Sequence, residues 1–188
     1  MRCIAQSFGG GIEKMESSFK TYRDVFEDDF ATQFGEYKEA FLNIKFTDSL
    51  EINVEDVASV LDIDVESSDM EQSGLIESSG NKAVIKVNQS EVSYRQRFTI
   101  AHEIGHKILR HLDQDAILYR AVQTFDPAIE NKLQERQAND FAANLLMPGK
   151  LVSYYIDELN IKDINILAQK FDVSSLSMEY RLINLGYI

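Results

Sequence analysis

Three residues in one short segment have types and a spacing that suit metal chemistry. His102, Glu103 and His106 form the pattern H-E-x-x-H, and the chain has only three histidines in all. Histidines four residues apart lie on one face of a helix, so both imidazoles can reach a single metal ion. The glutamate between them can then act as general base for a water molecule at that ion. The segment therefore indicates a metal-dependent hydrolase.

The surrounding residues predict a helix that places the pair beside a cleft. On a helical wheel, His102 and His106 lie at the edge of one continuous apolar arc, with Glu103 beyond them. Gly105 lies inside the arc, where the missing side chain allows a second helix to approach closely. His111 falls across the wheel, so we expect a surface residue or a partner of the helix dipole there, not a ligand.

A third ligand is predicted on a later helix, expected near residues 130–147. Catalytic zinc typically has three protein ligands and leaves its fourth position to water. Glu135 lies inside the apolar arc of this helix, where a carboxylate needs a partner because burying it alone is costly. Ala138 and Ala142 beside it would let the helix pack against Gly105. Glu135 is therefore the preferred third ligand.

Four other carboxylates stay open as ligands. Glu130 lies at the expected start of the later helix, where the helix dipole alone explains an acidic residue. Asp113, Asp115 and Asp126 lie in the loop between the two helices, and no spacing argument favours them. Cys3 is the only cysteine, so a site with several cysteine ligands is excluded.

The composition is that of a globular protein with an acidic surface. The 188 residues are 44% hydrophobic and 27% charged, and no apolar run is long enough to span a bilayer. The net charge of −12 argues against direct binding of nucleic acid. The N-terminal segment has no convincing cleavage site, and a single cysteine suits a reducing compartment. We therefore expect a cytoplasmic protein without membrane contact.

The N-terminal segment carries a regular aromatic pattern. Spacings of three and four residues predict one long helix within residues 12–46. The favoured interpretation is that its aromatic stripe packs on the domain core, and the alternative is a docking surface for a partner or a second copy. The stripe comprises Phe19, Tyr22, Phe26, Phe30, Phe34, Tyr37 and Phe41.

The next segment predicts a helix and a small sheet. Asp48 and Ser49 could cap a helix whose apolar residues recur from Val54 to Leu61. The turn signal at residues 78–81 indicates a hairpin. Two or three strands are expected, near residues 63–65, 75–76 and 83–87.

The last segment, residues 161–188, has the outline of a helix-turn-helix. Its charges are balanced, whereas a DNA reader concentrates positive charge on that element, so we expect a packing module. Together these elements predict a mostly helical α+β fold with a small sheet. We expect a helical extension over residues 1–47, a metallopeptidase domain over 48–160, and the helical module packed on it.

Two motifs resemble the signatures of a known family. Residues 97–106, RFTIAHEIGH, and residues 135–148, ERQANDFAANLLMP, are similar to those of the ImmA/IrrE metallopeptidases of bacteria and phages. The resemblance covers roughly residues 50–188. It implies a zincin-like domain of the gluzincin type.

The resemblance also implies a complete site. His102, His106 and Glu135 would be the metal ligands, and Glu103 the general base. The implied metal is Zn2+, although Mn2+ or another divalent ion would suit the same ligands. The implied reaction is hydrolysis of a peptide bond.

The biological role follows from the resemblance alone. Members of the family cleave or inactivate helix-turn-helix repressors, which releases genes of mobile elements, stress responses or toxin–antitoxin-like pairs. We therefore expect an endopeptidase with such a repressor as substrate. A regulator that binds a repressor or DNA without cutting is the rival hypothesis. A hydrolase that acts on another kind of bond is the third.

Overall fold

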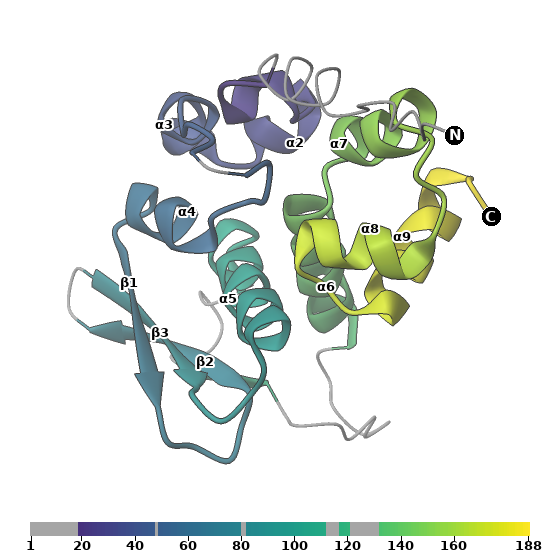
Figure 1. The fold of residues 1–188 in the computed structure, drawn as a ribbon. Coiled ribbons are helices and arrows are strands. Elements are labelled where there is room, and N and C mark those ends of the chain that lie inside the picture. Colours follow the sequence, from purple (N-terminus) through teal and green to yellow (C-terminus); the bar gives the residue numbers. More distant parts are fainter. Residues whose placement is uncertain (1–18, 48, 80–81, 112–116, 121–131) are drawn as a thin grey trace, which may run out of the picture.

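The computed structural model describes residues 19–188 apart from residues 48, 80–81, 112–116 and 121–131. A small sheet lies at one side of the molecule, helix α5 packs against it, and helix α6 packs against α5 (Figure 1). The predicted mostly helical α+β fold is confirmed. The boundaries expected between its domains stay a prediction.

The sheet has four strands in the order β1-β3-β2-β4. Strands β2 and β3 form the predicted antiparallel hairpin, and β1 pairs with β3 in parallel. Strand β4 pairs with β2 and falls where the sequence predicted only a loop, so that expectation was wrong. A four-residue strand has little pattern of its own, and pairing with β2 defines it. The strands are β1 (Ile63–Ser68), β2 (Gly74–Ser79), β3 (Lys82–Asn88) and β4 (Ile117–Arg120).

The helix before the sheet begins later than its expected cap. Helix α4 spans Val54–Val60, and its N-cap is Asn53 instead of Ser49. The Asn53 side chain accepts hydrogen bonds from the backbone N–H groups of Glu55 and Asp56, both at 3.1 Å. An asparagine next to the first turn satisfies these N–H groups directly, which explains the difference. Asp48, the other expected cap, lies outside the described residues.

Two longer helices follow in the positions that the sequence predicted. Helix α5 spans Ser93–Ile108 and helix α6 spans Lys132–Leu146 (Figure 1). Pro148 then precedes the short helix α7 (Gly149–Ser153), which continues as a π-helical turn over Tyr154–Glu158.

The single long N-terminal helix was a wrong prediction. Among the described residues, this segment instead contains four short helical pieces, and residues 12–18 lie outside the description. The pieces are a 3-10 turn at Tyr22–Asp24, α2 (Asp28–Thr32), a second 3-10 turn at Gly35–Tyr37, and α3 (Lys38–Leu42).

Aromatic packing explains why the segment folds back on itself. Gly35, the first residue of the second 3-10 turn, has a φ of +57°, a left-handed conformation that interrupts the regular helical path. The chain reversal stacks the rings of Phe34 and Phe41, whose centroids are 3.8 Å apart. Phe30 and Phe34 also contact Phe141 of α6. The segment therefore packs on the core, as the favoured interpretation predicted.

Most rings of the aromatic stripe are buried in the core, which leaves few of them for the alternative role as a docking surface. The side chains of Phe26, Phe34 and Phe41 are buried. Docking of a partner on this segment stays a prediction, and it would have to use the remaining, partly buried rings.

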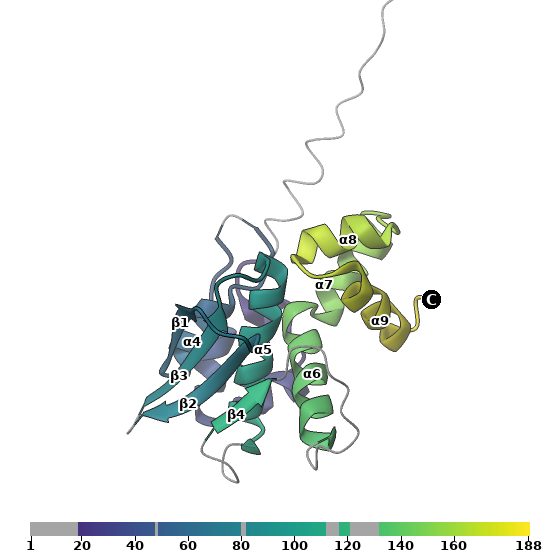
Figure 2. The same ribbon diagram turned by 90° about the horizontal axis from the view of Figure 1, so that it is seen from below.

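The C-terminal segment contains two helices joined by a short turn, and its assignment as a helix-turn-helix module stays a prediction. Helix α8 spans Ile164–Phe171 and helix α9 spans Ser175–Leu185 (Figure 2). Asp172 in the turn accepts a hydrogen bond from the Ser93 hydroxyl of α5 at 2.7 Å, and its carboxylate lies 3.4 Å from Arg97. These contacts attach the pair to the start of α5.

In the described part of the chain, no helix has the length and apolar character that crossing a membrane requires.

Candidate metal centre

Helix α5 carries the H-E-x-x-H residues through the interior of the molecule. Every residue from Thr99 to His106 is buried, because the sheet covers one side of the helix and α6 covers another. The sequence placed His102 and His106 at the edge of a cleft, but their side chains are 0% and 1% exposed. The wheel identified the face that they share and underestimated how much of α5 its neighbours cover.

The close approach of α6 depends on small residues. A Cβ atom added to Gly105 would lie 3.1 Å from the ring of Phe141 and 3.3 Å from backbone atoms of Ala138. The two helices therefore touch where the sequence placed a glycine opposite an alanine. This contact brings α6, and with it Glu135, next to the histidines.

The three predicted ligands converge in space. The Nε2 atoms of His102 and His106 are 2.9 Å apart. The Glu135 carboxylate lies 3.3 Å from the first of these nitrogens and 3.4 Å from the second. The first distance is to Oε2 and the second to Oε1, so the two carboxylate oxygens each face one imidazole nitrogen. One ligand atom from each of the three residues lies within 4.8 Å of the others.

This donor set fits a divalent metal ion. Bonds of about 2.0–2.1 Å in a tetrahedral site place neighbouring ligand atoms roughly 3.3 Å apart. Each histidine nitrogen lies near that value from one of the two Glu135 oxygens, and the histidine–histidine distance is slightly shorter. Two histidines and a glutamate are also one of the ligand sets that catalytic zinc uses.

Glu135 has the ionisation that a metal ligand needs. Burial raises the pKa of its carboxyl group, but when the imidazoles of His102 and His106 are protonated, their contacts with the carboxylate outweigh burial and hold the pKa well below its usual range. The carboxylate is therefore ionised at neutral pH. A third of the side chain stays exposed, so it lies at the rim of the site and not deep in the core as the wheel suggested.

His102 is oriented by the neighbouring helix. Its Nδ1 atom lies 2.9 Å from Oδ1 of Asn139, an oxygen that can only accept a hydrogen bond. Nδ1 must therefore donate, which leaves the lone pair of Nε2 directed at the metal site. Outer-shell partners of this kind commonly fix the tautomer of a metal-binding histidine.

The prediction that His111 lies on the surface was wrong. It is buried, and its Nδ1 atom lies 3.0 Å from Nδ1 of His106. The wheel assumed that α5 continued through His111, but the helix ends at Ile108 and Arg110 has a left-handed φ of +59°. The reversal at Arg110 turns His111 back toward the site. Burial lowers the pKa of His111, and His106 acts in the same direction, so its ring is neutral at pH 7.

Glu103 lies beside the ligands on α5 and is 1% exposed. The wheel placed it furthest toward solvent of the three motif residues, so its burial was not predicted. A carboxylate next to a metal site is a group of the kind that acts as a general base.

A comparison with known protein families decides the classification. Residues 58–183 match the model of a peptidase family described as the IrrE N-terminal-like domain. This match covers more than half of the chain and includes both helices that carry the site. The chain belongs to the IrrE N-terminal-like family. The resemblance predicted from the two motifs is confirmed.

Curated relatives agree with this assignment. The radiation response metalloprotease IrrE of Deinococcus radiodurans is 33% identical over 101 residues, which are 53% of this chain and 30% of that protein. Its namesake from Deinococcus deserti is 34% identical over 101 residues, again 53% of this chain and 35% of that protein. The matched segment thus spans about a third of the length of these relatives.

The fold is also found in a solved structure. A Mycobacterium tuberculosis transcriptional regulator superposes with a TM-score of 0.52 over 86% of this chain and 50% of its own, at 18% identity. At that identity the likeness concerns the fold alone.

The four other candidate ligands have no described position in this member of the IrrE N-terminal-like family. Asp113, Asp115, Asp126 and Glu130 all fall outside the described residues.

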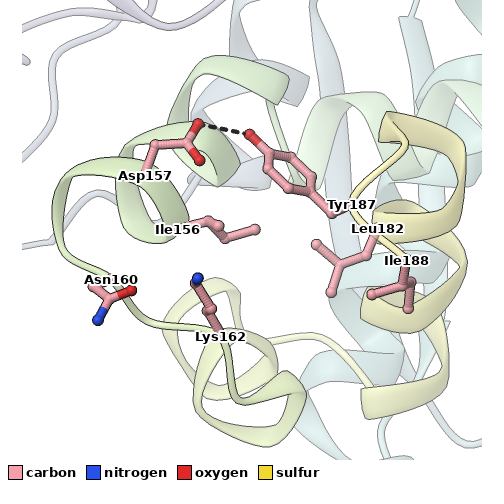
Figure 3. A pocket seen from close by; sticks show the side chains of 7 residues that line it. All are labelled: Ile156, Asp157, Asn160, Lys162, Leu182, Tyr187 and Ile188. Carbon is pink, nitrogen blue, oxygen red and sulfur yellow. Dashed lines mark hydrogen bonds between the residues drawn. The ribbon is translucent and has the colours of Figure 1, made fainter.

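A pocket of about 420 Å³ lies between the π-helical turn and the chain end, where Tyr187 donates a hydrogen bond to Asp157 at 2.9 Å (Figure 3). None of the metal-site residues lines it.

Proposed function

We propose that the chain is a metal-dependent endopeptidase of the ImmA/IrrE type. The observation that carries this proposal is the convergence of His102, His106 and Glu135 in a member of a peptidase family, with Glu103 buried beside them. The paired histidines on α5 and a glutamate on the following helix agree with a zincin-like domain of the gluzincin type.

Each residue has a distinct task in this proposal. His102, His106 and Glu135 would hold Zn2+, or Mn2+ or another divalent ion in its place. When bound, such an ion polarises a carbonyl group and makes water more acidic. Glu103 would accept a proton on its carboxylate from the attacking water and deliver it to the nitrogen of the leaving amine. The peptide C–N bond breaks as the new C–O bond forms.

A helix-turn-helix repressor is the proposed substrate. Support comes from the family membership and from the Deinococcus relatives, which are named radiation response metalloproteases, because a radiation response is a stress response. A mobile-element, stress or toxin–antitoxin-like system would then be the setting, and cleavage would relieve repression. Such a substrate would require a cytoplasmic enzyme.

The test is an incubation of the zinc-loaded protein with the repressor encoded by the neighbouring gene. We expect cleavage that stops when a chelator is added and resumes when zinc is restored. Glu103→Gln should reduce the rate by a factor of about 10² to 10⁴, the usual contribution of general acid–base catalysis. Glu179→Gln, the same change at an exposed position of α9, is the matched control and should leave the rate unchanged.

Two results would overturn the proposal. Stable binding of the repressor without cleavage would favour the regulator hypothesis. Full cleavage by Glu103→Gln would remove Glu103 from the mechanism.

A further inference from the structure

One buried polar group at the site is not used by the proposed chemistry. His111 is 6% exposed, and it follows α5 by only three residues. Both of its ring nitrogens have partners: Nδ1 lies 3.0 Å from Nδ1 of His106, and Nε2 lies 3.2 Å from Oε1 of Gln137. A buried imidazole with both nitrogens paired has a fixed orientation, so it can transmit that orientation to a neighbour.

The positions of the protons on His111 and His106 follow from the acceptor at the end of this series of contacts, Oε1 of Gln137. Oε1 of Gln137 can only accept, so Nε2 of His111 must donate to it. In a neutral imidazole the other nitrogen then carries a lone pair, and Nδ1 of His111 must accept. Nδ1 of His106 is therefore the donor in the contact between the two histidines. This leaves Nε2 of His106 with its lone pair toward His102 and Glu135.

Both metal-site histidines thus depend on α6, but by different routes. Asn139 accepts directly from His102, whereas Gln137 acts on His106 through His111. Both amides lie within four residues of Glu135 on the same helix. One helix therefore contributes a candidate ligand and sets the tautomers of the other two.

We propose that His111 and Gln137 form a positioning relay that fixes the ring and tautomer of His106 for metal binding. The relay rests on the proposed function, because its purpose is to prepare a metal ligand. His111 and Gln137 are positioning residues, and neither needs to touch the metal or the substrate. Loss of an outer-shell partner typically weakens metal binding by a factor of 10 to 100.

The test measures zinc affinity of the full chain by competition with a chromophoric chelator. His111→Leu removes the acceptor, and we expect roughly 10- to 100-fold weaker zinc binding. His111→Gln keeps an acceptor in the side chain and should recover part of the loss. Gln137→Leu should weaken binding in the same direction, and the double variant should lose less than the product of the two single effects.

A control variant and a second measurement separate positioning from a general loss of structure. Arg136→Leu alters the exposed neighbour of Gln137 and should leave zinc affinity unchanged. Gln137 is itself exposed, so Gln137→Leu tests the relay even where His111→Leu does not fold. Nitrogen NMR of the metal-free protein gives a second readout: His106 should carry its proton on Nδ1 in the wild type, and this preference should weaken in Gln137→Leu.

The possible results distinguish the relay from the proposed function. Zinc affinities of His111→Leu and Gln137→Leu within twofold of wild type, with His106 unchanged by NMR, would overturn the relay and leave the metallopeptidase intact. A wild-type protein that binds no zinc, but keeps the Nδ1 proton on His106, would instead contradict the proposed function.

Discussion

The helix pairs α5–α6 and α8–α9 resemble each other in outline and differ in what they bury. Helix α5 buries four polar side chains, those of Thr99, His102, Glu103 and His106. The α8–α9 pair buries one, Arg181, which donates a hydrogen bond to the backbone oxygen of Met147 at 2.9 Å. Its other buried residues are apolar or small: Leu167, Ala168, Phe171, Met178 and Leu182.

The difference agrees with the proposal that α5–α6 holds the metal site. Burying polar groups costs free energy unless they are satisfied, and a fold built for stability alone has no need of several in succession. For His102 and His106 this cost is offset by contacts with Glu135, Asn139 and His111. In α8–α9 the interior is that of a packing unit. The exposed side chains of Leu176, Tyr180 and Ile183 lie on its outer surface.

The largest effect that separates the two pairs is expected from loss of a carboxylate. Glu135→Ala removes one of three ligands, and zinc affinity should fall by more than the roughly 100-fold that an outer-shell change can cost. Glu179→Ala on α9 is the matched control and should have no effect. Equilibrium dialysis against zinc measures both. Unchanged affinity in Glu135→Ala would place the third ligand elsewhere.

A smaller effect is expected from filling the contact between α5 and α6. Gly105→Leu would press on Phe141 and the backbone of Ala138, and overpacking of this kind costs about 1–3 kcal/mol of unfolding free energy. Gly149→Ala places its new atom in ordinary contact with Leu185, 3.6 Å away, and should stay within about 0.5 kcal/mol of wild type. Urea denaturation gives both values. Equal stability of the two variants would contradict the close packing.

The smallest effect is expected at the cap of α8. The Asp163 side chain accepts from the backbone N–H groups of Asn165 and Ile166, at 2.8 and 3.1 Å. Asp163→Ala should lower the unfolding free energy by about 1 kcal/mol, and Asp163→Asn should retain most of it. Zinc affinity should not change in either variant. Loss of zinc binding in Asp163→Ala would show that α8–α9 is coupled to the site.

The sequence predicted the elements whose pattern is local. The β-branched, apolar residues from Ala83 to Val87 and the turn before them predicted the hairpin. The spacing of His102 and His106 predicted their shared helix face. Glu135 was found because a carboxylate on an apolar arc needs a partner. The family motifs carried the same residues.

Two wrong predictions, the long N-terminal helix and the surface position of His111, share one cause, which is that the chain turns where a local pattern predicted a continuing helix. Aromatic residues at helical spacing predicted a long helix, but Gly35 and the stacking of Phe34 on Phe41 turn the segment back. His111 was placed by extending a helix that ends at Ile108. Nothing in the sequence indicated the left-handed conformation of Arg110, because a non-glycine residue rarely adopts it.

The most direct test of the central claim is the position of the metal itself. Anomalous diffraction at the zinc edge from zinc-loaded crystals should give one peak per chain, bound by Nε2 of His102, Nε2 of His106 and the carboxylate of Glu135. Nδ1 of His106 should still face His111. A peak at another set of residues, or none at this one in a protein that binds zinc in solution, would contradict the account.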